Sequence, residues 1–347
     1  MNANGRFLIG FYGDDFTGST DAMEALMKNG VRTVLFFEPP SARLLSEKFL
    51  DIQAFGVAGV SRAMSPEEME RELPRVFQAL KASGASVIHY KTCSTFDSAP
   101  HIGSIGKAID IARTIFTEQR YVPLVAGVPP LKRYTVFGNH FATVGDTTYR
   151  LDRHPVMTRH PVTPMNEADL TLHLAKQTDK RISLMNIVEL SAADDVAEQT
   201  LERKLAKEQP EIVLFDALDE PGLAKIGGII WREAARAPLF AAGSSGIEYG
   251  LGSYWRNFGL TGTGMDSSNK TGVSRLLVIS GSCSPVTEGQ IRHALAHGFH
   301  GIKIPTLDWI DPAKSEAAIR SVYEEARQRL AEGRSVMVYS ALGPEDP

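Results

Sequence analysis

The stretch that decides the fold is FLIGFYGDDFTGSTDAMEAL, residues 7–26. It opens with a short apolar run, Phe7–Tyr12, which is typical of a buried strand, and from Ser19 onward it has the apolar spacing of a helix. Between these segments stands Gly13-Asp14-Asp15-Phe16-Thr17-Gly18. A strand is therefore predicted to turn directly into a helix, with two carboxylates at the turn.

The same alternation of strand and helix continues along the chain. Further strands are predicted at residues 33–37, 52–57, 86–90, 121–125, 182–185, 212–215 and 239–241, and helices at 66–81, 102–116, 192–207 and 221–235. Such alternation favours an α/β fold, in which a mostly parallel sheet carries helices on both faces. Ligands then bind beyond the carboxyl ends of the strands.

A polar stretch interrupts this pattern near the end of the chain. Residues 259–274, GLTGTGMDSSNKTGVS, are rich in Gly, Ser and Thr and lack apolar periodicity. We predict a large domain over residues 1–260, a linker over 261–274 and a smaller, incomplete α/β domain over 275–347. The smaller domain is expected to contain strands at 276–280, 301–304 and 336–339, with helices at 285–297 and 312–330.

Composition narrows the classes of function. The chain has 347 residues, of which 43% are hydrophobic and 22% charged, as in an ordinary globular protein. A net charge of −4 without any basic run argues against a nucleic-acid partner, and no apolar run is long enough to span a membrane. The only cysteines, Cys93 and Cys283, are far apart, so neither a disulfide nor a structural zinc is expected. We expect a cytoplasmic protein and leave a homodimer open.

The first candidate site is the acidic turn. Asp14 or Asp15 could orient a substrate hydroxyl or accept its proton, and Thr17 could donate a hydrogen bond from the start of the following helix. The alternative is an acidic turn that only caps the helix.

The second candidate site is YKTCSTFDSAPHIGSIGKAID, residues 90–110, which also follows a predicted strand. Lys91 supplies a cation, Ser94 and Thr95 supply hydroxyl groups, and Asp97 supplies an acceptor. A cation beside hydroxyl groups suits a substrate carboxylate. The alternative is a polar loop whose hydroxyl groups cap turns.

The third candidate site is VAGVPPLKRYTVFGNHFAT, residues 125–143, in which the prolines are expected to fix a loop. Asn139 and His140 could hydrogen-bond a polyol, and Arg133 is a further candidate for substrate binding. His140 could also act as a general base because imidazole titrates near neutral pH. A purely structural histidine is the alternative.

Two glycine-serine turns complete the set, one at Gly243-Ser244 and the other containing Ser282 and Ser284. Each follows an apolar run and precedes a helix, so its N–H groups could hold an oxyanion such as a phosphate. The alternative is an ordinary strand-to-helix joint. The chain lacks the G-x-x-x-x-G-K-[ST] pattern of a P-loop, and its histidines and acidic residues show no metal-ligand spacing.

Taken in order, these segments resemble the four-carbon acid sugar kinase family. GDDFTGSTDAMEAL is similar to its acidic motif, KTCSTFDSAPHIGSIG to its Lys-Ser-Thr motif, VPPLKRYTVFGNHFA to its third sugar-site segment, and AAGSSG and VISGSCSPVTEGQI to its later turns. In many relatives an Arg-Gly-Asn follows the Ser-Thr pair. Phe96-Asp97-Ser98 stands here instead, as in the branch of 3-oxo-tetronate kinases.

The resemblance implies an ATP-dependent kinase with Mg²⁺ that phosphorylates a hydroxyl of 3-oxo-tetronate, threonate, erythronate or a related acid. It implies Asp14 and Asp15 as catalytic groups, and Ser282, Ser284, Gly243 and Ser244 as contacts to ATP. Relatives continue beyond the position of Pro347 with further glycine-rich ATP segments that these 347 residues lack. The alternative is therefore a shortened relative that binds sugar acids without catalysis. An aspartyl-phosphate phosphatase is disfavoured, because its chemistry would need Asp-x-Asp.

Overall fold

The computed structural model describes residues 7–262, 264 and 272–346. The chain divides into two compact units, Met1–Met265 and Asp266–Pro347. The division falls within the predicted linker, most of whose central part, 263 and 265–271, lies outside the described residues. The exact domain boundaries stay a prediction.

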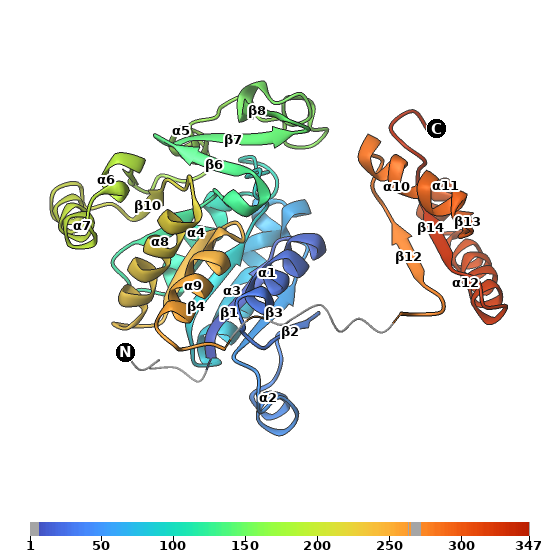
Figure 1. Cartoon of the computed structure of the whole chain (residues 1–347), viewed down its shortest axis with the longest axis horizontal. Coiled ribbons are helices and arrows are strands. Elements are labelled where there is room, and N and C mark those ends of the chain that lie inside the picture. The colour runs from blue at the N-terminus through green and yellow to red at the C-terminus, as the bar shows by residue number, and fades with distance from the viewer. Residues whose placement is uncertain (1–6, 263, 265–271, 347) are drawn as a thin grey trace. The chain divides into compact units, whose positions relative to one another are not determined.

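A parallel sheet of eight strands forms the centre of the first unit (Figure 1). Its strands are β1 (Phe7–Gly13), β2 (Thr33–Phe36), β3 (Ala54–Ala58), β4 (Ala85–Lys91), β5 (Val122–Val125), β9 (Ile182–Met185), β10 (Ile212–Phe215) and β11 (Leu239–Gly243). They lie in the order β2-β3-β1-β4-β11-β5-β10-β9, and all pairs are parallel. The predicted α/β fold class is confirmed.

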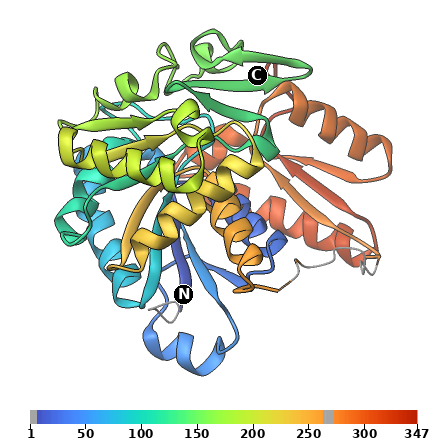
Figure 2. The same cartoon turned by 60° about the vertical axis from the view of Figure 1, so that its left-hand side comes forward.

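Helices cover both faces of this sheet (Figures 1 and 2). The helices of the unit are α1 (Phe16–Lys28), α2 (Ala42–Lys48), α3 (Pro66–Ala82), α4 (Ile105–Ile115), α5 (Leu170–Leu174), α6 (Ile187–Ser191), α7 (Asp194–Glu208), α8 (Glu220–Ala234) and α9 (Gly246–Asn257). Strand β10 alternates between the two cores. Ile212 and Leu214 belong to the core that contains residues of α3 and α4, whereas Val213 and Phe215 belong to the core that contains residues of α1, α8 and α9. Because the strands are buried on both faces, their sequences are continuous apolar runs.

The strand order changes direction between β1 and β4. From β1 the chain builds β2 and β3 on one side of β1, and then returns to place β4 on its other side. The loops that leave neighbouring strands at such a point diverge, which opens a crevice at the carboxyl edge. Asp14 follows β1 and Lys91 ends β4, so both residues lie at this point.

A separate antiparallel sheet was not predicted. It contains β6 (Arg133–Val136), β7 (Asn139–Val144) and β8 (Thr147–Arg150). A proline-fixed loop was predicted here, and only the turn Pro129–Leu131 before β6 fits that description. After β8 come two further short 3₁₀ turns, Leu151–Arg153 and Met157–Arg159. The third candidate site is therefore a hairpin region rather than a loop.

The second unit is a smaller α/β fold with a parallel sheet in the order β12-β14-β13. Its elements are β12 (Leu277–Ser280), α10 (Pro285–Ala296), β13 (His300–Lys303), α11 (Thr306–Ile310), α12 (Ser315–Ala331) and β14 (Val336–Tyr339). The predicted small parallel sheet is confirmed. None of the helices in the described ranges of either unit combines the length and apolar character needed to cross a bilayer.

Candidate active site

The acidic turn begins helix α1. Asp15 is the N-cap residue, and its Oδ1 accepts a hydrogen bond from the Gly18 N–H at 2.7 Å. Asp14 is 1% exposed, and its own N–H donates to the Lys91 carbonyl oxygen at 2.9 Å. The cap therefore uses only Asp15 Oδ1, and the remaining carboxylate oxygens of the pair are left for other partners.

Arg62 holds both carboxylates. Its Nη2 and Nε contact Asp14 Oδ1 and Oδ2 at 2.6 and 3.1 Å, and its Nη1 contacts Asp15 Oδ2 at 2.8 Å. Arg62 was not among the predicted site residues. A signal for it was present, because Arg62 shortly follows strand β3 and so belongs to the same carboxyl edge as the acidic turn.

The ionisation of this group is set by burial. Burial raises the pKa of Asp14 to about 6, although Arg62 lowers it. Burial also lowers the pKa of Arg62, but the contacts with Asp14 and Asp15 more than reverse this and leave it raised. Arg62 therefore stays charged, whereas Asp14 changes charge close to neutral pH.

A cavity of about 360 Å³ opens beside the acidic turn. Its polar lining includes Asp14, Asp15, Arg62, His160 and Thr163, and its apolar lining includes Phe16, Val60, Ala63, Ile102 and Val162. His160 and Thr163 come from the segment after β8, which was not predicted to belong to the site. The volume is within the range of pockets that bind small molecules.

Lys91 lies beneath the first turn of α1. It is 1% exposed, and its Nζ is 3.2 Å from Asp21 Oδ2 and 2.9 Å from the Thr92 carbonyl oxygen. Thr17, in that same turn, is exposed. The structure thus brings Lys91 close to the acidic turn, whereas Arg62 is the cation that lines the cavity.

The remaining residues of the second motif form a compact turn. Thr95 donates from Oγ1 to Asp97 Oδ1 at 2.8 Å, and the Cys93 Sγ lies 2.9 Å from Thr95 Oγ1. Cys93 is partly buried, and burial raises the pKa of its thiol to about 11. Ser94 is half-buried in the same turn. These contacts fix the shape of the loop, and the predicted substrate contacts of Ser94, Thr95 and Asp97 stay predictions.

His140 joins the third motif to the second. It is fully buried, its Nε2 lies 2.7 Å from the Ser94 carbonyl oxygen, and its Nδ1 lies 2.9 Å from Thr135 Oγ1. Burial lowers the pKa of His140 to about 4, so the ring is neutral near pH 7. With both nitrogens engaged, this arrangement suits a bridge between two motifs better than proton transfer.

Arg133 and Asn139 make local contacts. Arg133 Nη1 donates to the Leu131 carbonyl oxygen at 2.8 Å, and Asn139 Nδ2 donates to the Phe137 carbonyl oxygen at 3.1 Å. Both residues are half-buried. Their predicted contacts with substrate stay predictions.

Gly243 and Ser244 lie at the same sheet edge as Lys91. Gly243 pairs with Lys91 across β11 and β4, and its carbonyl oxygen accepts from the Thr92 N–H at 2.6 Å. Gly243 has a φ of 143°, and a Cβ at this position would meet the Val125 carbonyl oxygen at 2.0 Å, so only glycine fits. Ser244 is fully buried. Both residues therefore lie among the strand ends of the first unit.

Ser282 and Ser284 lie in the second unit. Ser284 is the N-cap residue of α10 and accepts from the Thr287 N–H at 3.2 Å, while Ser282 Oγ accepts from the Ser284 N–H at the same distance. Cys283 lies between them and is exposed. A capped helix start with exposed N–H groups can hold a phosphate, and this role stays a prediction.

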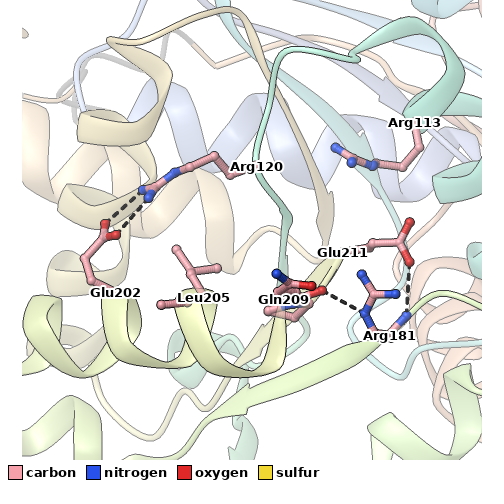
Figure 3. A pocket seen from close by; sticks show the side chains of 9 residues that line it. Arg113, Arg120, Arg181, Glu202, Leu205, Gln209 and Glu211 are labelled. Carbon is pink, nitrogen blue, oxygen red and sulfur yellow. Dashed lines mark hydrogen bonds and ion pairs between the residues drawn. The ribbon is translucent and has the colours of Figure 1, made fainter.

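A second hollow has a volume of about 610 Å³, and Figure 3 shows the side chains that line it. It lies at the opposite, amino edge of the sheet. Its residues Arg181 and Glu211 directly precede strands β9 and β10, and Arg120 lies two residues before β5. Arg120 pairs with Glu202, and Arg181 Nε donates to the Gln209 carbonyl oxygen at 2.8 Å. The amino edge of a parallel sheet is seldom the ligand edge, and these contacts read as a structural ion network.

Metal coordination finds little support in the geometry. Across residues 7–262, 264 and 272–346, no group of three or more His, Cys, Asp or Glu side chains is placed to hold an ion.

Comparison with known proteins assigns both units. The family model described as the sugar-binding N-terminal domain matches residues 9–251, and the nucleotide-binding C-terminal domain matches residues 277–347. The first match covers well over half of the chain.

Two curated relatives and one solved structure extend this comparison. A 3-oxo-isoapionate kinase from Paraburkholderia graminis is 48% identical over 98% of this chain and 71% of its own length. A 3-oxo-tetronate kinase from Pseudomonas savastanoi pv. phaseolicola is 29% identical over 99% of this chain and 75% of its own. The structure of a putative tRNA synthase from Salmonella typhimurium has a TM-score of 0.76 at 23% identity, over 97% of this chain and 75% of that one, which shows a shared fold.

The two matched domains and the 48% identical kinase point to the same family as the motifs of the sequence. The site lies where the strand order changes direction, within the matched sugar-binding domain. The chain belongs to the four-carbon acid sugar kinase family.

Proposed function

We propose that the chain transfers a phosphoryl group from ATP to a hydroxyl of a four-carbon sugar acid of the 3-oxo-tetronate type or a related branched acid. One observation carries the proposal: Asp14, Asp15 and Arg62 line a small cavity at the switch point of the sheet, within the region matched by the sugar-binding family model. The names of the two curated relatives support the same substrate class.

In this proposal the carboxylates direct the attacking hydroxyl. Asp15 is 30% exposed and reachable from the cavity, so it accepts the proton of the substrate hydroxyl as the new O–P bond forms. The bond between the γ-phosphorus and the bridging oxygen breaks, and ADP leaves with that electron pair. Arg62 lines the cavity and supplies positive charge for an acid substrate, and Asp14 fixes its guanidinium. Lys91 adds positive charge from beneath the acidic turn.

The nucleotide is assigned to the second unit, with Ser282 and Ser284 near its phosphates. Mg²⁺ bound to those phosphates would neutralise the charge that develops during transfer. Positioning and electrostatics account for most of the rate in such reactions, so the arrangement of both substrates matters more than covalent help from the protein.

The test is Asp15→Asn. The asparagine Oδ1 can still accept from the Gly18 N–H, so helix α1 keeps its cap while the site loses a negative charge. We expect kcat to fall by about 10²- to 10⁴-fold with little change in KM, measured as ADP release over a panel of four-carbon acids. Turnover at the wild-type rate would rule out the role given to Asp15.

Asp219→Asn is a matched control. Asp219 is the N-cap residue of α8 and accepts from the Gly222 N–H at 2.7 Å, with backbone angles close to those of Asp15. It makes the same cap outside the cavity, so this substitution should leave turnover unchanged. Calorimetry with the same acids separates the binding-only alternative, which would give heat without ADP release.

A further inference from the structure

We propose that His160 is a specificity-determining residue, which donates a hydrogen bond from Nε2 to the oxo or hydroxyl oxygen of the bound sugar acid. This inference rests on the proposed function and concerns the same cavity. Within the sequence, His160 belongs to HPVTPM, residues 160–165, a segment whose prolines suggest only a turn.

The proton of the imidazole is placed by its neighbours. His160 Nδ1 accepts from the Thr163 N–H at 3.0 Å and lies 3.0 Å from Thr163 Oγ1. A backbone N–H can only donate, so Nδ1 carries no proton in this arrangement. In the neutral ring the proton is therefore on Nε2, which makes no hydrogen bond with any described residue of the chain.

The segment that carries His160 is firmly held. Met157 and Met165 belong to a small core with Ala142, Leu151 and Ala168, which packs β7 against the turns that follow β8. The Met165 N–H donates to the Met157 carbonyl oxygen at 2.9 Å, which closes the segment around His160. Packing of this loop thus fixes the position of the His160 ring at the cavity.

The chemistry of the cavity favours a donor at this position. Asp14 and Asp15 are acceptors, and three N–H groups of Arg62 already point at them. A substrate oxo oxygen can only accept, so it gains from a fixed donor, whereas a substrate hydroxyl could instead donate to a carboxylate. His160 Nε2–H is a fixed donor among the side chains that line the cavity. Its removal should weaken binding of 3-oxo acids more than binding of their 3-hydroxy counterparts.

Two amide substitutions separate the functions of the two ring nitrogens. His160→Asn keeps an acceptor near the position of Nδ1 for the Thr163 N–H, but provides no donor at the position of Nε2. His160→Gln places an amide donor near the position of Nε2 and loses the acceptor. We expect His160→Asn to raise KM for a 3-oxo-tetronate about tenfold, the effect of one lost hydrogen bond, with kcat within about threefold of wild type. His160→Gln should retain most of the wild-type KM.

The KM values of the two variants test the donor role of His160 separately from the kinase proposal. If His160→Asn has the wild-type KM for oxo and hydroxy acids alike, or if His160→Gln is impaired as strongly as His160→Asn, the donor role is overturned while the kinase proposal stands. If the wild type releases no ADP with any acid, the kinase proposal fails. In that case calorimetry measures the affinity of the 3-oxo acid for the wild type and for His160→Asn. Equal affinities, or no binding to either protein, would overturn the donor role of His160.

Discussion

Two opposing effects set the ionisation of Asp14. Burial favours the neutral carboxyl group, and the guanidinium of Arg62 favours the charged one, yet the pKa still rises from 3.8 to about 6. Asp15, which also lines the cavity, repels a second negative charge on Asp14, and Lys91 attracts it. The charge of Asp14 therefore responds to small changes of pH near 6.

This balance predicts an acid limb in the pH profile. Below about pH 6 Asp14 takes up a proton and its ion pair with Arg62 weakens, so kcat/KM for the sugar acid should fall with an apparent pKa near 6 in the free enzyme. Because Arg62 lowers the pKa of Asp14, Arg62→Met should move the limb to higher pH. Arg62→Lys should move it less. Profiles measured from pH 5 to pH 9 would contradict this if the limb stays fixed in Arg62→Met.

Some residues of the site can be predicted from the sequence, and others cannot. Asp14 and Asp15 follow from local rules, since a strand that turns into a helix places its carboxylates at the ligand edge. Arg62 could have been found by the same rule applied to β3. His140 contacts Thr135 and Ser94, and His160 lines the same cavity as the acidic turn. These arrangements depend on contacts between segments that are distant in the sequence. No local pattern reveals such contacts.

At the scale of single elements, one carboxylate helps to hold the hairpin β6–β7 against the main sheet, beside the two backbone hydrogen bonds between Thr135 and Ala217. Asp216, just after β10, accepts from the N–H groups of Phe137, Gly138 and Ile187 at 2.5, 2.9 and 2.9 Å. Phe137 and Gly138 form the hairpin turn, and both have positive φ. A phenylalanine is strained there, and Asp216 helps to hold it. The hairpin in turn carries His140 to the Ser94 loop.

Asp216→Asn should weaken this attachment of the hairpin. An amide has one acceptor oxygen, so its NH₂ group would face backbone donors and at least one buried N–H would lose its partner. We expect a loss of about 1–3 kcal/mol in the free energy of unfolding. Urea titration measures that loss, and hydrogen exchange at residues 133–144 should become faster.

Asp169→Asn serves as the comparison, because asparagine also caps a helix start and α5 should be unaffected. If both variants lose the same free energy of unfolding, the hydrogen bonds of Asp216 stabilise the protein no more than those of an ordinary helix cap.

The hairpin itself escaped prediction for a physical reason. Its turn is Phe137-Gly138, whereas the strong hairpin signal is Asn-Gly or Asp-Gly, which tolerates positive φ at both positions. The strands are short, and β8 is largely exposed, so apolar alternation is weak. The strands of the main sheet, buried on both faces, gave a much clearer signal.

At the scale of the whole molecule, strand order was the property that the sequence could not supply. Alternation predicted a parallel sheet, but not that β11 lies between β4 and β5. That position depends on long-range contacts such as the buried pair of His89 Nδ1 and Glu248 Oε1, 2.5 Å apart, which joins β4 to α9. Insertion of β11 also brings Gly243 beside Lys91.

The two units should differ in stability. The first has two large cores, whereas the described core of the second centres on Ile302, Ile304, Ala326, Val336 and Val338. Less buried apolar surface means a smaller free energy of local unfolding. Hydrogen exchange with mass spectrometry should therefore show amides of β14 exchanging at lower urea concentration than those of β4. Equal protection of both strands would contradict this.

The unequal surroundings of the two cysteines have a practical consequence for spectroscopy. Alkylating reagents attack the thiolate, which is scarce at Cys93 because its pKa is about 11, whereas Cys283 is exposed. A maleimide dye added to the unaltered protein at pH 7 should thus attach at one place, between the two serines assigned to the nucleotide phosphates. Its emission would give a direct optical signal of nucleotide titration without engineering a label site.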